Sequence, residues 1–212
     1  MKKNLKKSLL FEQLKVSRET CEDFEKFTSM ILIKNEEINI VSKKNSDSSV
    51  IMDRHIIDSA QIIDFVDLNS NTTYDLGAGA GFPGIIIAIM IKNMNINNKV
   101  TLYEKSHHKS LFLREVSRKL NLDTEVIQKN IIEATKLKSG TIMARAFKPL
   151  PVVLDLVFKN FNSYKNLIVF MGKSGKKSLE EALKNWKFDF EKKKSITNED
   201  SFILNIKNIE KI

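Results

Sequence analysis

The chain carries the sequence DLGAGAGFPG at residues 75–84, which begins within a short strand-like segment at residues 72–76. Four of the seven glycines in this chain of 212 residues fall within that stretch. Glycine is needed where the backbone takes a positive φ or approaches a ligand closely, and a following helix offers free N–H groups. The stretch therefore predicts a turn between a strand and a helix, and a nucleotide-like ligand bound at that turn.

Two classes of ligand fit this glycine turn. Gly79, Gly81 and Gly84 satisfy the G-x-G-x-x-G pattern of dinucleotide sites, and Glu104 follows about twenty residues later, where a carboxylate can hold ribose hydroxyls. Asp75 favours the other class, because a carboxylate repels a pyrophosphate and attracts the ammonium and sulfonium charges of S-adenosylmethionine. Two alternatives stay open: Asp75 turned away from the ligand to cap the turn, and Glu104 at an exposed strand end.

From residue 72 onward, the sequence alternates between strand and helix patterns. Strands are expected at residues 72–76, 100–103, 124–128, 141–144 and 166–170, and two more at 188–192 and 202–206. Helices are expected between them at residues 84–92, around Phe112 and Val116, near 152–161 and near 179–186. This order predicts an α/β, Rossmann-like fold with a seven-stranded, mostly parallel sheet that binds ligands at the carboxyl ends of its strands.

The first 68 residues carry helical patterns instead. Apolar residues recur at helical spacing from Leu9 to Leu32, a polar loop is expected at residues 42–49, and Asp53 is expected to cap a helix that continues to Phe65. We therefore divide the chain into an N-terminal helical extension at residues 1–69 and a ligand-binding domain at residues 70–212.

The composition predicts the cellular compartment and the class of partner of the protein. The longest apolar run, residues 85–91, is far too short to span a membrane, and the basic N-terminus lacks a secretory signal, so a cytoplasmic protein is expected. The single cysteine, Cys21, cannot form an internal disulfide. A net charge of +9 favours a polyanionic partner such as RNA, although a lysine-rich, AT-rich coding bias would produce the same charge.

Three motifs together resemble one known family. They are DLGAGAGFPG at residues 75–84, Arg54-His55-Ile56-Ile57-Asp58-Ser59 before it, and Arg145-Ala146-Phe147 after it. With them the chain resembles the bacterial small-subunit ribosomal RNA methyltransferase G family, also called glucose-inhibited division protein B, from Asn39 to Lys207. The resemblance implies a class I methyltransferase fold with an N-terminal helical extension. It also implies methyl transfer from S-adenosylmethionine to N7 of one guanine in 16S rRNA.

The resemblance also implies which residues form the site. It places cofactor contacts at Gly77, Phe82, Ile131, Ile132 and Arg145, with Glu104 at the ribose. The pattern of the glycine turn adds Gly79, Gly81 and Asp75 to the expected cofactor site. The substrate-side candidates are Arg54, His55 and Asp58, for which an Arg54–Asp58 ion pair and an ordinary packed histidine are the structural alternatives. The chain departs from the family at three places. The family commonly has Asp at position 104 and an acidic residue at position 132, and it often has Trp-Asn before an Asn-Leu-Thr segment, where this chain has Lys34-Asn35 and then Asn39-Ile40-Val41.

The expected chemistry needs few catalytic groups. Guanine N7 carries a free lone pair and no proton, so positioning and electrostatics suffice without a general base. Cytosine C5 methylation needs a cysteine nucleophile, and Cys21 lies in the helical extension. His107 and His108 are adjacent without a further metal-type ligand, so no metal site is expected. The expected partner is 16S rRNA or the 30S subunit, bound by a monomer. The alternatives are an NAD-dependent oxidoreductase and a catalytically silent RNA-binding module.

Overall fold

The protein is described by a computed structural model that covers residues 11, 14, 16–42 and 47–212. Seven strands form one sheet in the order β3-β2-β1-β5-β7-β9-β8. All neighbouring strands are parallel except β9, which is antiparallel to both β7 and β8. The strands are β1 Thr72–Leu76, β2 Lys99–Tyr103, β3 Thr124–Ile127, β5 Thr141–Arg145, β7 Asn166–Met171, β8 Trp186–Lys194 and β9 Phe202–Lys211. The predicted α/β fold with a mostly parallel sheet is confirmed.

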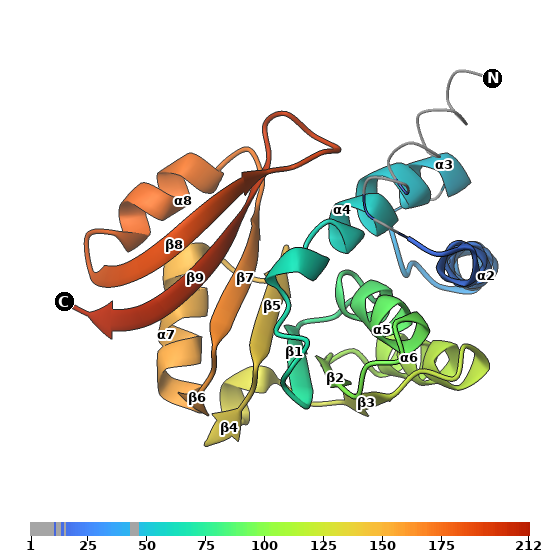
Figure 1. Ribbon diagram of the computed structural model, residues 1–212, viewed down its shortest axis with the longest axis horizontal. Coiled ribbons are helices and arrows are strands. Elements are labelled where there is room, and N and C mark those ends of the chain that lie inside the picture. The colour runs from blue at the N-terminus through green and yellow to red at the C-terminus, as the bar shows by residue number, and fades with distance from the viewer. Residues whose placement is uncertain (1–10, 12–13, 15, 43–46) are drawn as a thin grey trace.

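Helices cover both faces of the sheet (Figure 1). Helices α5 (Gly84–Asn93) and α6 (His107–Lys119) lie on one face, and α7 (Leu150–Asn160) and α8 (Gly175–Ala182) lie on the other. A 3-10 turn, η4 (Ile131–Glu133), follows β3, and a two-stranded sheet pairs β4 (Leu137–Lys138) with β6 (Phe161–Ser163). The carboxyl ends of β1, β2 and β5 therefore meet at one edge of the sheet.

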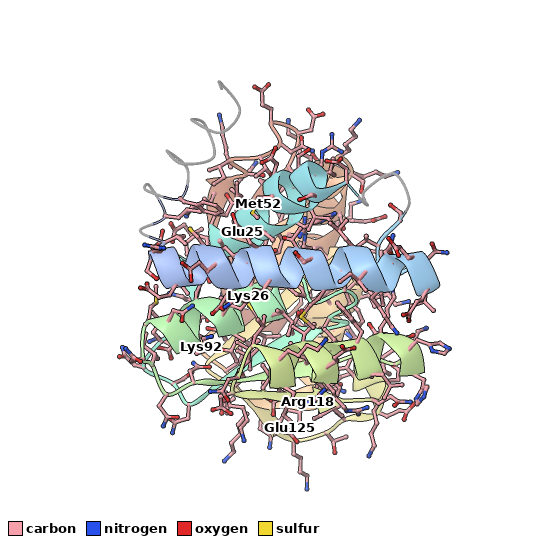
Figure 2. The ribbon with its side chains drawn as sticks, turned by 90° about the vertical axis from the view of Figure 1, so that its right-hand side faces the viewer. Glu25, Lys26, Met52, Lys92, Arg118 and Glu125 are labelled. Atoms are coloured by element: carbon pink, nitrogen blue, oxygen red, sulfur yellow. The ribbon has the colours of Figure 1, made fainter. Side chains whose placement is uncertain are left out.

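The N-terminal helices form a further layer outside α5 and α6. Figure 2 shows α2 (Arg18–Glu37) running alongside these two helices, which lie below it in that view. Phe24 and Phe27 of α2 are fully buried in the same apolar cluster as Ile85 and Phe112. Lys92 of α5 donates a hydrogen bond to the carboxylate of Asp23 at 2.6 Å and tethers the layer. Helix α5 therefore packs against the sheet on one side and against α2 on the other. This explains why residues 85–91 are all apolar, since none of them faces solvent.

The segment after the α2 layer differs from the sequence prediction in one detail. Asp47, rather than Asp53, is the helix cap: its side chain accepts from the backbone N–H groups of Ser49 and Val50 at the start of α3 (Ser48–Ile51). Asp53 lies inside a π-helical turn, η2 (Met52–Ile56), which continues into α4 (Ile57–Ala60) and the 3-10 turn η3 (Ile63–Phe65). The predicted helix around Leu9 and Leu10 lies outside the described residues. The division at residue 69/70 stays a prediction, and both sides of it contribute to one apolar cluster.

The C-terminal elements are longer than predicted. Trp186 begins β8 instead of ending a helix, and α8 starts at Gly175. The two final strands extend to Lys194 and Lys211, because their antiparallel pairing continues beyond the apolar stretches that mark them in the sequence. Within the part of the chain that the structure describes, no helix combines the length and hydrophobicity needed to cross a membrane.

Candidate active site

A cavity of about 570 Å³ opens at the carboxyl ends of β1, β2 and β5. We call it the first cavity. Seven of the residues predicted at the cofactor line it: Gly77, Gly79, Phe82, Glu104, Ile131, Ile132 and Arg145. Asp75 and Gly81 do not line it. Because these seven residues come from four separate chain segments, the fold assembles most of the predicted cofactor set at one place.

The backbone of the glycine turn forms one wall of the first cavity. Gly77 has φ +75°, and a Cβ built there would overlap the ring of Phe147. Gly81 has φ +102°, and a Cβ there would meet Ile85 and Phe27 behind the turn. Side chains at these positions would therefore strain the backbone and collide with neighbours. Gly77 therefore leaves room for the Phe147 ring, which lines the same cavity, whereas Gly81 lets the turn pack on the core.

Glu104 fixes the opposite side of the turn. Its carboxylate accepts a hydrogen bond from the backbone N–H of Gly79 at 2.9 Å and another from that of Ser106 at 2.7 Å. The side chain lies at the end of β2 and is largely buried. The structure therefore differs from the alternative in which Glu104 lies at an exposed strand end. Glu104 links the glycine turn to the start of α6 while its carboxylate borders the cavity.

Asp75 occupies a different position from the one predicted. Its side chain is fully buried, and Oδ2 accepts a hydrogen bond from the backbone N–H of Gly84 at 2.8 Å. The carboxylate thus caps α5, whose first turn has no other side-chain cap, and it does not reach the ligand cavity. Burial raises the pKa of Asp75 to about 7, against the opposing effect of the Gly84 hydrogen bond. The geometry corresponds to the capping alternative.

Arg145 connects the end of β5 to the π-helical turn. Its guanidinium donates to the backbone carbonyls of Arg54, at 2.7 Å, and His55, at 3.4 Å. It also forms an ion pair with Asp58 at 3.1 Å. Asp58 therefore pairs with Arg145, not with Arg54, because the side chain of Asp58 turns inward whereas that of Arg54 is exposed. Arg145 is a half-buried link between two chain segments rather than a free surface charge.

His55 stacks on Phe82 beside this link. The two ring centroids are 4.9 Å apart with an interplanar angle of 23°. Burial, together with the nearby charges of Arg145 and Arg54, lowers the pKa of His55 to about 4. The imidazole is therefore neutral at pH 7. Its Nε2 is buried and has no hydrogen-bond partner among the described residues.

A second cavity, of about 720 Å³, lies on the other side of His55 and Arg145. It is lined by the three substrate-side candidates Arg54, His55 and Asp58, together with Arg145, Lys173 and residues of the loop between β8 and β9. His55 and Arg145 line both cavities. The structure therefore brings the substrate-side candidates together next to the predicted cofactor site, but in a separate hollow.

Sequence reasoning missed two groups of residues that shape these cavities. Ser195 and Thr197, in the loop between β8 and β9, line the second cavity or bond to its wall, and in the sequence they are only part of a polar turn. Asn160, at the end of α7, donates to the backbone carbonyls of Ile131 and Ile132 and so holds η4 at the first cavity. No local signal marks either group, since each acts on a segment distant in sequence.

Comparison with known proteins gives the family. The profile of the family described as rRNA small subunit methyltransferase G matches residues 20–204. The ribosomal RNA small subunit methyltransferase G of Pelagibacter ubique is 68% identical over 202 residues, which cover 95% of each chain. The protein of the same name from Bartonella henselae is 36% identical over 198 residues, covering 92% of this chain and 89% of its own.

Solved structures of low sequence identity share the fold. A SAM-dependent O-methyltransferase from Thermotoga maritima superposes with a TM-score of 0.53 at 13% identity, covering 70% of this chain and 63% of its own. A SAM-dependent methyltransferase from Aquifex aeolicus gives a TM-score of 0.50 at 14% identity, covering 69% and 92%. These likenesses confirm the predicted class I methyltransferase fold. The matches over nearly the whole chain place the protein in a family of enzymes: it belongs to the rRNA small subunit methyltransferase G family.

Proposed function

We propose that this protein transfers a methyl group from S-adenosylmethionine to N7 of guanine 527 in 16S rRNA, as a monomer in the cytoplasm. The observation that carries the proposal is the family match over residues 20–204, joined to a glycine-lined cavity at the strand ends where that fold binds its ligand. Membership of a methyltransferase family removes the reason to favour an NAD-dependent oxidoreductase. The specific nucleotide is implied by the family.

The first cavity suits S-adenosylmethionine. Gly77 and Gly79 offer an open backbone surface, and Glu104 supplies a carboxylate acceptor for ribose hydroxyls. Ile131 and Ile132 offer an apolar surface for an aromatic base, in place of the acidic side chain that the family commonly has at position 132. When bound, the cofactor supplies a methyl group on a positively charged sulfur. Asp75 contributes indirectly, because it fixes the turn and the start of α5 rather than touching the ligand.

The charges where the two cavities meet favour this transfer. Methylation at N7 leaves the guanine ring positively charged, so uncompensated positive charge beside it would oppose the reaction. The charge of Arg145 is balanced by Asp58 and shared with two backbone carbonyls. His55 carries no charge at pH 7, because its pKa lies near 4. Arg145 and His55 therefore line both cavities without adding net positive charge at the reacting atoms.

The second cavity is lined by two exposed cations, Arg54 and Lys173, that can contact RNA phosphates. Two exposed carboxylates of the loop between β8 and β9 line the same cavity. The neutral His55 ring, stacked on Phe82, adds an aromatic surface between the two cavities. Because N7 needs no proton removed, these side chains are required to hold and orient the base, not to act as a general base.

The test is a methylation assay with the purified protein, radiolabelled S-adenosylmethionine and 30S subunits from cells that lack the modification. We expect label in 7-methylguanosine at a single position of 16S rRNA, identified by mass spectrometry of nuclease fragments. A parallel reaction with naked 16S rRNA defines the form of substrate. Binding of subunits without any label would instead favour the silent RNA-binding module, and label on another atom would contradict the N7 assignment.

A further inference from the structure

The loop at residues 195–201, between β8 and β9, forms the outer wall of the second cavity. It is the one wall of that cavity that comes from the antiparallel end of the sheet, far in the sequence from the segment that holds Arg54 and His55. Figure 1 shows this loop reaching from the ends of β8 and β9 toward α4. The size and shape of the second cavity therefore depend on what holds this loop against α4.

Asp58 holds the loop with one carboxylate oxygen. Its Oδ1 accepts hydrogen bonds from Ser195 Oγ at 2.8 Å and from Thr197 Oγ1 at 3.1 Å. The same oxygen accepts from Gln61 Nε2 at 2.7 Å, while Oδ2 pairs with Arg145 at 3.1 Å. Asp58 is 8% exposed, so water competes little for these bonds. One buried carboxylate thus joins the loop to the arginine that borders both cavities.

Gln61 reinforces the same attachment through the backbone. It is fully buried, and its Oε1 accepts from the backbone N–H of Ile196 at 3.1 Å. Its own backbone carbonyl accepts from Lys193 Nζ at 2.7 Å. Ser195 Oγ in turn accepts from the backbone N–H groups of Thr197 and Asn198, both at 3.2 Å, which sets the shape of the loop. The loop is therefore fixed at three consecutive residues.

We propose that Asp58 is a positioning residue, and that the loop it holds is the part of the site that receives the target nucleotide in the second cavity. Asp58 acts on other protein groups, since its Oδ1 accepts three hydrogen bonds and its Oδ2 pairs with Arg145. Its effect on the reaction runs through the loop on one side and Arg145 on the other. Transfer between two bound reactants is sensitive to small displacements, so a loosened loop weakens the placement of the nucleotide and leaves the cofactor site intact. This inference rests on the proposed function.

The double variant Ser195→Ala/Thr197→Ala tests it, because it removes two donors to Asp58 and leaves the Asp58–Arg145 ion pair in place. Three quantities are measured: the Kd for 30S subunits with S-adenosylhomocysteine present, the KM for subunits in methylation, and the Kd for S-adenosylhomocysteine alone. We expect the first two to rise about tenfold, as the loss of hydrogen bonds to a charged group predicts, and the third to stay within about twofold. Thr197→Ser, which keeps the hydroxyl, should bind subunits like the wild type.

Asp189→Ala is the matched control. It removes a hydrogen bond from Asn208 within the same pair of strands, away from the second cavity, and should leave all three quantities unchanged. An unchanged affinity of the double variant for subunits, or an equal loss of affinity for S-adenosylhomocysteine, would overturn the proposal. Wild-type protein that binds subunits but methylates nothing contradicts the proposed function alone, because the binding measurement still decides the role of the loop. A wild-type protein that does not bind subunits contradicts both.

Discussion

The first and second cavities lie side by side but are built in different ways. One wall of the first cavity is a continuous backbone turn at residues 77–82, which Asp75 supports from behind and Glu104 links to the end of β2. The second cavity is assembled from side chains on the π-helical turn, the end of β5 and the loop at residues 195–201. Its parts are joined by bonds between residues up to 139 positions apart.

This difference separates two kinds of sensitivity to mutation. A backbone wall has no side chain to lose, so it fails when an added atom changes its conformation. A wall of side chains is disrupted when a substitution removes one bond of its network. The buried partner of that bond is then left without its opposite charge or its hydrogen-bond donor. Substitutions in the glycine turn should therefore act on cofactor binding, and substitutions in the second wall on the substrate and on stability.

The largest effect is expected from Gly77→Ala. The substitution combines a strained positive φ with overlap between the new Cβ and the Phe147 ring. Together these costs should weaken binding of S-adenosylhomocysteine by about a hundredfold or more, measured by calorimetric titration.

Gly172→Ala is the control for a glycine substitution in itself. Gly172 has no positive φ, and a Cβ there meets no atom within 4 Å. Its affinity for S-adenosylhomocysteine should match that of the wild type. Tight binding by Gly77→Ala would show that the turn can rearrange, and it would remove the contrast between the two walls.

Arg145→Ala should give the next largest effect, because Arg145 lines both cavities. Removing it leaves Asp58 buried without its charge partner and frees the carbonyls of Arg54 and His55. We expect the free energy of unfolding to fall by about 3 kcal/mol, measured in urea, and methylation to fall by at least about tenfold. Arg145→Lys keeps the charge but not the planar group that reaches four acceptors, so it should recover only part of either loss. Unchanged methylation in Arg145→Ala would contradict any role for Arg145 in the site.

Asp75→Asn tests whether the support behind the first wall is electrostatic. The pKa of Asp75 is raised from 3.8 to about 7 by burial, so between these values the folded protein holds a proton that the unfolded chain has lost. Stability contributed by this group is present below about pH 4 and falls as the pH rises to about 7. Asparagine keeps the acceptor for Gly84 and cannot ionise. The variant should gain stability relative to the wild type over this range, reaching a few kcal/mol at pH 8. Parallel stability curves from pH 4 to 8 would show that the carboxylate does not titrate there.

The contrast also explains what the sequence could predict. The glycine turn and Glu104 were predictable because a strand, a turn and a helix are local, and because parallel strands end at a common edge. The partner of Asp58 was not, since pairing with Arg54 four residues earlier is the only choice visible in the sequence. The π-helical turn and the inward rotation of Asp58 select Arg145 instead. Asp75 was predicted on charge alone, and only the structure reveals that Gly84 competes for its carboxylate.

The smallest effect is expected from exposed lysines that line the first cavity. Lys105, Lys129 and Lys148 line the opening of the first cavity, from three different segments, and all three are exposed. If RNA covers this opening during transfer, each lysine that neutralises a phosphate should contribute to the salt dependence of binding. Lys105→Gln/Lys148→Gln should weaken binding of 30S subunits several-fold and reduce the slope of log Kd against log salt concentration by roughly 0.7 to 0.9 for each lost contact.

Lys187→Gln, on β8 and paired with Glu210, is the matched loss of charge far from both cavities and should leave the slope unchanged. Equal slopes in all variants would mean that RNA approaches only through the second cavity, which would make the functional separation of the two walls sharper still.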